Sequence, residues 1–226
     1  MSRFVHVVQR ALLVSALGVA ACTGSLFHSK AAPPTVYLLS AGQASPRDGL
    51  PASGAPAAGR PAPEIPVDLA VLKPKARAGL ESDRIAVLYP DRRLDYFADA
   101  RWSGPLGEVL QDLAVQEFHS HANLRTVSGD GSVFASAYWL EIEVTDFQAE
   151  YASAASAPTV HVQFLARLGS SGDRHILAHF AASARQPAAE NRLSSIVDAF
   201  AHAADASLAE IVAHAEEMLA KTSEAR

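Results

Sequence analysis

The fold is decided by three stretches of sequence: YWLEIEVT at residues 138–145, VHVQFLARL at 160–168 and ILAHFAA at 176–182. In each stretch every second side chain is apolar, which is the pattern of a strand whose successive residues point to opposite faces of a sheet. The residues GSSGD at 169–173 have the composition of a hairpin turn. Together these segments predict an antiparallel meander with one covered face.

The predicted cover of this face is helical. A second helix is expected to follow Ser103, whose side chain can cap it, with Pro105 in its first turn. Shorter strands are predicted at residues 67–71 and 85–89. The elements predict an α/β fold of two layers, in which a largely antiparallel sheet is covered by two helices. Apolar side chains at helical spacing form the stripe of a long C-terminal helix: Leu193, Ile196, Val197, Phe200, Ala204, Leu208, Ile211, Val212 and Leu219.

Cys22 is the only cysteine in the chain and ends the run Val19-Ala20-Ala21-Cys22. Basic residues in the first ten positions and an apolar stretch at 11–21 give the layout of a secretory signal. The apolar stretch is shorter than the roughly 20 residues of a membrane-spanning helix. We therefore predict a lipoprotein signal peptide at residues 1–21 and covalent acyl groups, palmitate among them, on Cys22. The alternative is an ordinary signal peptide with a chance cysteine at its end.

The predicted mature chain begins with Cys22 and Thr23. By resemblance to bacterial lipoproteins, which use aspartate after the cysteine as an inner-membrane retention signal, Thr23 favours the periplasmic face of the outer membrane. Without residues 1–21 the chain keeps 17 basic and 24 acidic residues, a net charge of −7. This charge speaks against binding to nucleic acid, and against binding to anionic lipid by charge alone. Attachment to the membrane would depend on the acyl chains.

The chain beyond the signal is predicted to contain a tether and one domain. Residues 22–35 are interpreted as the lipid-anchored tether, and residues 36–222 as the domain. Residues 36–39 form a short strand-like run. A Pro/Ala/Gly-rich insertion at 40–66 follows and has little apolar surface to bury.

The sequence lacks the motifs that commonly place a catalytic nucleophile or a nucleotide phosphate, among them Gly-x-Ser-x-Gly, Gly-x-x-x-x-Gly-Lys-Ser/Thr and His-Glu-x-x-His. We therefore predict that the protein is not an enzyme and uses no cofactor beyond its acyl groups. His161 and His179 would lie diagonally on adjacent strands if Leu168 stood opposite Arg174. Two ligands without a carboxylate or thiolate are a weak metal-binding set, so no metal site is predicted.

The outer face of the first meander strand carries both acidic and aromatic side chains. Glu141, Glu143 and Asp146 are interpreted as residues that keep this face solvated, rather than as an acid–base pair. Trp139 lies on the same face and has two open interpretations: it forms a contact surface, or it packs against a helix.

Four parts of the sequence carry a resemblance to a known family. The first is the Cys22 motif followed by YLL at residues 37–39, and the second is DRIAV at 83–87 followed by LDYFADARWSGPL at 94–106. The others are EVTDF at 143–147 and the closing helix. This order resembles the ABC-type transport auxiliary lipoproteins, the PqiC-like group. The chain departs from that pattern at SG in 103–104 and through the insertion at 40–66.

The resemblance implies a fold similar to the TolB N-terminal domain and a non-enzymatic role beside an MCE-type ABC transporter. The protein would dock the periplasmic MCE protein, which works with a permease and an ATPase in phospholipid transport between membranes. Tyr96, Arg101, Trp102 and Pro105 are the candidate partner-binding residues, although Trp102 and Pro105 can equally serve only to fix the start of the helix. A homo-oligomer would suit such a docking platform.

Two other functions remain open from the sequence. A lipid-binding carrier module would hold the transported lipid itself, and it would need an apolar pocket. A lipoprotein of envelope assembly or polysaccharide export could use the same fold and the same anchor.

Overall fold

The computed structural model describes residues 33–40, 64–129, 135–153 and 156–224 of the chain. The predicted signal peptide, Cys22 and most of the predicted insertion, residues 41–63, lie outside the described residues. The elements are β1 (Thr35–Tyr37), β2 (Ile65–Val71), β3 (Lys75–Ala76), β4 (Arg84–Leu88), β5 (Leu94–Trp102), α2 (Leu106–His121), β6 (Leu124–Gly129), β7 (Tyr138–Glu150), β8 (Thr159–Ser170), β9 (Ile176–Pro187) and α3 (Leu193–Glu224).

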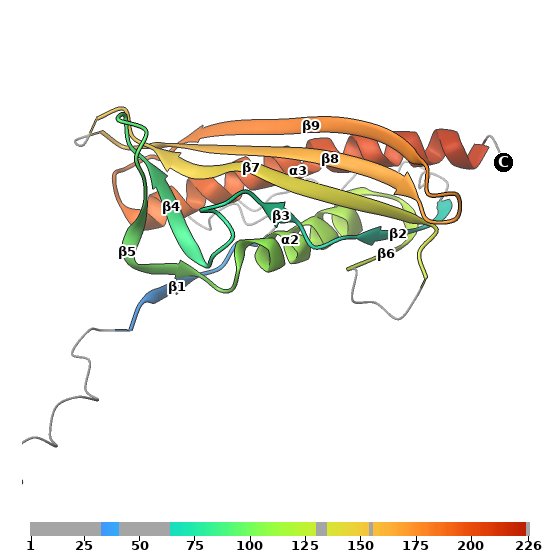
Figure 1. Cartoon of the computed structure of the whole chain (residues 1–226), viewed down its shortest axis with the longest axis horizontal. Coiled ribbons are helices and arrows are strands. Elements are labelled where there is room, and N and C mark those ends of the chain that lie inside the picture. Colours follow the sequence, from blue (N-terminus) through green and yellow to red (C-terminus); the bar gives the residue numbers. More distant parts are fainter. Residues whose placement is uncertain (1–32, 41–63, 130–134, 154–155, 225–226) are drawn as a thin grey trace, which may run out of the picture. The chain divides into compact units, whose positions relative to one another are not determined.

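The meander predicted from sequence alternation is confirmed as β7, β8 and β9 (Figure 1). Both ladders are antiparallel, and β8 is the middle strand. Its even-numbered residues from Val160 to Leu168 are buried toward the helices, whereas Leu165 and Arg167 are exposed on the outer face. The alternation therefore reports a real difference between the two faces of the sheet.

The register of the β8–β9 hairpin differs from the one considered above. Leu168 pairs with Ala178 rather than with Arg174, because the ladder continues to Gly169 opposite Ile176 and contains an irregularity beside Leu168. His161 consequently pairs with Arg185, and His179 pairs with Arg167. The two histidines are six residues apart along the ladder, about 20 Å at the rise of a strand. The diagonal His161–His179 arrangement is therefore wrong, and the described residues contain no group of three or more His, Cys, Asp or Glu suited to a metal.

On one side β7 has parallel neighbours, which the sequence patterns did not indicate. β7 pairs with β8 along one edge, and along the other edge it pairs in parallel with β2, β3 and β4. Parallel neighbours need a crossover connection, and α2 lies in the chain between β2 and β7. The sheet is thus mixed, with its longest ladders antiparallel, and the predicted α/β class is confirmed.

The two helices form the second layer and cover the inner face of the sheet (Figure 1). The predicted stripe of α3 is confirmed, since Ile196, Phe200, Leu208, Ile211 and Leu219 are all almost fully buried. The expected cap of the other helix is wrong: α2 begins after Pro105, which is its N-cap residue, and no side chain caps it. No helix in the described ranges is both long and apolar enough to cross a membrane.

The strand expected at 36–39 is β1, which spans Thr35–Tyr37 and pairs in parallel with β5. Leu39 follows it and is buried. Beyond the gap, β2 already begins at Ile65. The ordered sheet therefore includes residues at both borders of the predicted insertion, while the division of the chain into tether and domain stays a prediction.

Glu117 on α2 is a buried carboxyl group, with only 2% of its surface exposed. Burial raises its pKa; His121 opposes this rise through an ion pair at 3.0 Å, and the Asp205 carboxyl of α3 adds to it. Because the folded protein favours protonated Glu117, this group stabilises the fold most at a pH below its unfolded pKa. That contribution is lost as the pH rises through the higher folded pKa.

We expect Glu117→Gln to remove this pH dependence, because glutamine keeps the shape of the side chain without a titrating proton. The melting temperature of wild-type protein relative to that of Glu117→Gln should fall as the pH rises from about 4.5 toward neutrality. The difference between the two melting profiles over that range measures the contribution of Glu117. Glu217→Gln on α3 is the control, since Lys221 lowers the pKa of exposed Glu217 and the sign is opposite. Identical profiles for wild type and Glu117→Gln would contradict the expectation.

Candidate partner-binding site

The four predicted partner-binding residues lie along β5 and the start of α2, and one short segment connects them. This connecting segment is residues 82–84, between β3 and the beginning of β4. Arg84 contacts Tyr96, Asp83 pairs with Arg101, and the Ser82 carbonyl accepts the amide of Leu106 at 3.2 Å, next to Pro105. Asp83 and Arg84 belong to the DRIAV stretch that carries the family resemblance, whereas Ser82 precedes it. The role of this segment in joining the four residues was not predicted.

Tyr96 is half-buried under the guanidinium of Arg84. The Arg84 Cζ atom lies 3.8 Å from the ring centroid, and the Tyr96 hydroxyl donates a hydrogen bond of 2.8 Å to the Gly79 carbonyl. A cation over an aromatic face at an exposed site is worth about 0.5–1 kcal/mol. The pair therefore presents a guanidinium held in a defined position rather than a freely moving side chain.

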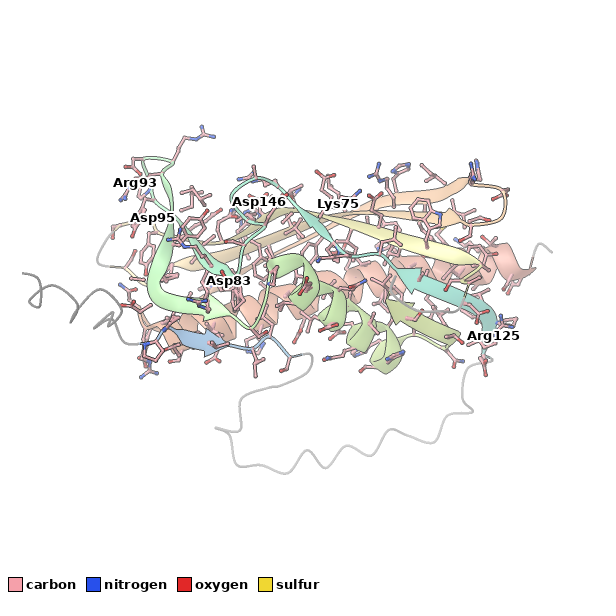
Figure 2. The ribbon with its side chains drawn as sticks, turned by 60° about the horizontal axis from the view of Figure 1, so that its bottom comes forward. Lys75, Asp83, Arg93, Asp95, Arg125 and Asp146 are labelled. Carbon is pink, nitrogen blue, oxygen red and sulfur yellow. The ribbon has the colours of Figure 1, made fainter. Side chains whose placement is uncertain are left out.

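Arg101 points outward from β5 toward Asp83. Its Nη1 atom lies 3.4 Å from Asp83 Oδ2, and the two side chains are 46% and 37% exposed. Exposed ion pairs of this kind contribute at most about 1 kcal/mol to stability. Arg101 is thus available at the surface and contributes little to holding the fold together. Figure 2 shows Asp83 beside β4, well separated from Arg125 on β6.

Trp102 is buried, with 1% of its surface exposed. Its ring meets Phe200 of α3 edge-on at a centroid distance of 5.3 Å and Phe147 of β7 at 6.0 Å. Phe147 and Phe200 stack at 5.0 Å. These three aromatic residues, the aromatic core, connect β5 to β7 and to α3. Trp102 therefore supports the neighbouring surface from inside, and the assignment of all four residues to partner binding stays a prediction.

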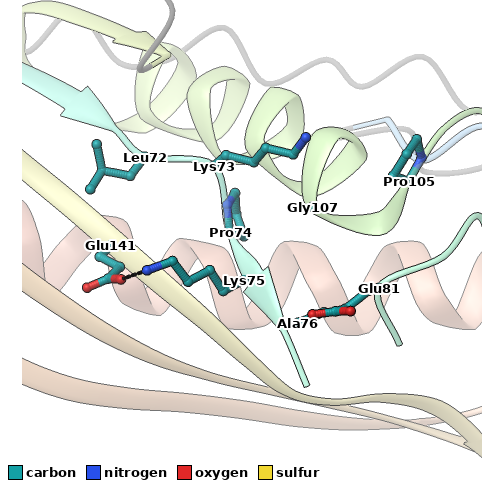
Figure 3. A pocket seen from close by; sticks show the side chains of 9 residues that line it. All are labelled: Leu72, Lys73, Pro74, Lys75, Ala76, Glu81, Pro105, Gly107 and Glu141. Carbon is teal, nitrogen blue, oxygen red and sulfur yellow. Dashed lines mark hydrogen bonds and ion pairs between the residues drawn. The ribbon is translucent and has the colours of Figure 1, made fainter. Parts of the chain in front are cut away.

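Pro105 is exposed at the start of α2, and its carbonyl accepts the amides of Glu108 at 2.9 Å and Val109 at 3.2 Å. It borders an open hollow with a volume of about 460 Å³ (Figure 3). The hollow lies between α2, β3 and β7, and its lining residues are Leu72, Lys73, Pro74, Lys75, Ala76, Glu81, Pro105, Gly107 and Glu141.

Gly107 forms one wall of this hollow because α2 approaches the chain at Pro74 very closely. A Cβ atom at position 107 would lie 2.5 Å from the Pro74 carbonyl oxygen, so only glycine fits without displacing backbone. The rim is charged: Lys73 pairs with Glu108 at 2.7 Å, and Lys75 pairs with Glu141 at 2.8 Å. The hydrogen bond from Lys75 lowers the pKa of Glu141, so this carboxylate stays ionised.

The outer face of the meander carries the acidic residues and Trp139. Trp139 lies directly over Gly169 of β8, where an added Cβ atom would overlap the indole ring. Trp139 thus packs on the outer face of its own sheet, and it also borders a hollow with Ala70 and Leu72. Trp139 therefore packs against a neighbouring strand, whereas the two interpretations from the sequence were packing against a helix and an exposed contact surface.

A polar network that sequence reasoning missed lies farther along the same face. Arg185 donates to Glu150 at 2.6 Å, and His161 Nδ1 lies 3.1 Å from the other Glu150 oxygen. Buried Gln148 donates to both Asp146 and Glu150. Burial alone would raise the pKa of Glu150, but the hydrogen bonds from Arg185 and Gln148 outweigh it and lower the pKa. The members satisfy one another, which is the arrangement of a structural network.

The family described as "ABC-type transport auxiliary lipoprotein component" matches residues 50–212. The chain belongs to this family. That description names an auxiliary transport component rather than an enzyme, in agreement with the resemblance seen in the sequence. No curated protein matches the chain.

Solved structures share the fold of this family member. A crystal structure of a Xanthomonas campestris protein assigned to the family DUF330 aligns with a TM-score of 0.66 at 22% identity, covering 85% of this chain and 97% of its own. An uncharacterized protein aligns with a TM-score of 0.58 at 14% identity, covering 83% and 99%.

We expect Trp102→Ala to lower the free energy of unfolding by about 3–5 kcal/mol, because it leaves a cavity between Phe147 and Phe200. Trp102→Phe keeps an aromatic ring in that place and should cost clearly less. Denaturant unfolding followed by circular dichroism measures both values. If Trp102→Ala unfolds at the wild-type midpoint, the side chain does not support the fold as described.

Proposed function

We propose that this auxiliary lipoprotein is held by acyl groups on Cys22 at the periplasmic face of the outer membrane. There it docks the periplasmic MCE protein of an ABC transporter that moves phospholipid between the two membranes. Membership of the transport auxiliary family supports the general role. The MCE partner, the lipid cargo and the membrane assignment rest on the sequence resemblance, on Cys22 and on Thr23.

The observation that carries the docking proposal is the arrangement around residues 82–84. This segment contacts Tyr96 through Arg84, Arg101 through Asp83, and the start of α2 beside Pro105. The result is a surface with two guanidinium groups, one aromatic ring and an adjoining hollow. Arginine and aromatic side chains are enriched at binding hot spots, and guanidinium groups pair well with carboxylates. We name this area the docking surface.

The rigidity of the docking surface fits a binding role. The aromatic core holds β5 from below through Trp102, and Gly107 allows α2 to lie close against Pro74. A surface that is already ordered loses little conformational entropy when a partner binds. A homo-oligomer that repeats this surface around a ring would add avidity toward a multi-subunit partner.

Arg101→Ala and Tyr96→Ala should each weaken binding of the MCE protein, by about tenfold for a hot-spot residue. Arg101→Ala should change stability little, because its ion pair is exposed. Tyr96→Ala also removes packing against the core and the hydrogen bond to Gly79, so its binding is compared at a temperature where the variant is folded. The measurement is co-purification of the MCE protein with the full acylated chain from detergent-solubilised envelopes, with thermal unfolding recorded in parallel.

The matched control is Arg125→Ala. Arg125 is 51% exposed and paired with Asp68, much as Arg101 is 46% exposed and paired with Asp83, but it lies on β6. It should leave co-purification unchanged. If no variant of the docking surface differs from Arg125→Ala, the surface is misassigned. If native protein captures no MCE or permease component, the proposed partner itself is wrong.

Cys22→Ala should move the protein from the membrane fraction to the soluble periplasmic fraction, because the proposed anchor consists of acyl chains alone. Fractionation on a density gradient, with mass spectrometry of the mature N-terminus, tests this expectation. Native protein that sediments with the inner membrane would contradict the outer-membrane assignment.

A further inference from the structure

We infer that the edge of the sheet formed by β1 lies against the phospholipid surface to which Cys22 is anchored. The contact would be made by Val36 and Leu38; we name these two residues the membrane edge. This inference rests on the proposed acylation of Cys22 but not on the identity of the transporter partner. It assigns an orientation to the domain.

The first observation is the exposure of Val36 and Leu38. These side chains are 56% and 71% exposed, the highest values among the large hydrophobic residues that the structure describes. Residues two apart in an extended segment point to the same side, so both emerge together. Tyr37, between them, is half-buried and packs against the core. The edge therefore presents two aliphatic side chains to the surroundings without being part of the core.

The second observation is the row of residues next to them. Val36 is the register partner of Arg101 on β5, and Arg101 is the register partner of Arg84 on β4. Paired residues on neighbouring strands project from the same face, so an aliphatic side chain and two guanidinium groups follow one another across three strands. Arg101 is paired with Asp83 and belongs to the docking surface, so the lipid contact itself is the apolar one of Val36 and Leu38. The membrane edge and the docking surface are therefore neighbours, and lipid contact at the first leaves the second open to a protein partner.

The third observation is the position of the edge in the chain. Thr35, the first residue of β1, is 13 residues after Cys22, and such a segment spans at most about 45 Å when fully extended. The anchor therefore keeps the edge at a high effective concentration near the lipid, so even a contact of two side chains is sufficient for a preferred orientation.

The length of β1 argues against a protein occupant that adds a strand. Strand addition uses a row of backbone hydrogen bonds, and β1 offers only three residues. By contrast, β9 is a twelve-residue strand that pairs, within the described part of the chain, only with β8. A partner strand or a second copy would find a longer template there than at β1.

Site-specific fluorescence tests the inference, because the chain contains a single cysteine and its thiol would be acylated. A bimane label is placed through Val36→Cys or Leu38→Cys in the full acylated protein. The protein is then reconstituted into vesicles of phosphatidylethanolamine and phosphatidylglycerol with doxyl-labelled lipids. Leu165→Cys is the matched control, since Leu165 is an exposed aliphatic residue on β8. We expect quenching at 36 and 38 to exceed that at 165 several-fold and to persist at high salt, because the contact is mainly apolar.

Several outcomes would overturn the inference. Equal quenching at all three positions would mean that the edge has no preferred contact with lipid. Shielding of the label in detergent that grows with protein concentration would identify a second copy as the occupant, and shielding only after addition of the MCE protein would identify that partner. Because position 38 is the most exposed, Leu38→Cys should fold even if Val36→Cys does not. Failure of the docking variants with normal quenching at 36 and 38 would overturn the docking surface alone.

Discussion

The structure depends on the thirteen-residue strand β7, which pairs with β8 on one side and in succession with β2, β3 and β4 on the other. An irregularity in the β7–β8 ladder, between Val144 and Asp146, changes which residues face the helices. Before it the even-numbered side chains of β7 are buried, and after it Phe147 takes the inner face. Without this bulge Phe147 would point outward and could not meet Trp102 and Phe200.

The aromatic core links this feature to the docking surface. Phe147 belongs to β7, Phe200 to α3 and Trp102 to the end of β5, so three elements from distant parts of the chain converge at one point. The Trp102 amide donates a hydrogen bond of 2.7 Å to the Asp83 carbonyl, and shortly after Trp102 the chain turns into α2. The position of Arg101 and Pro105 is therefore set by burial of their neighbour. The buried side chain of Trp102 thus stabilises the fold, while its exposed neighbours Arg101 and Pro105 belong to the proposed docking surface.

Parts of the fold were predictable because their signals are local. Alternation at 138–145 and 160–168 reflects one buried and one exposed face, and the stripe from Leu193 to Leu219 reflects the period of a single helix. The register of β8 against β9 was not predictable, because the ladder continues beyond Leu168 and contains an irregularity that composition does not reveal. The parallel pairing of β2, β3 and β4 with β7 depends on contacts between residues distant in sequence.

The candidate site was also predictable only in part. The order of residues around Trp102 indicated the family, but the burial of Trp102 and the stacking of Arg84 on Tyr96 arise from three-dimensional packing. The polar network of Glu150, His161 and Arg185 was missed because its members come from three strands whose register was unknown.

The contact of Trp139 with Gly169 has a consequence for how the sequence can change over evolution. With the indole in place, no side chain fits at position 169, so a mutation there becomes acceptable only after the tryptophan has been replaced by something smaller. The two positions, thirty residues apart, are therefore expected to vary together among descendants of this chain. Such covariation would let a comparison of related sequences locate the β7–β8 register, which the alternation of a single sequence leaves undetermined.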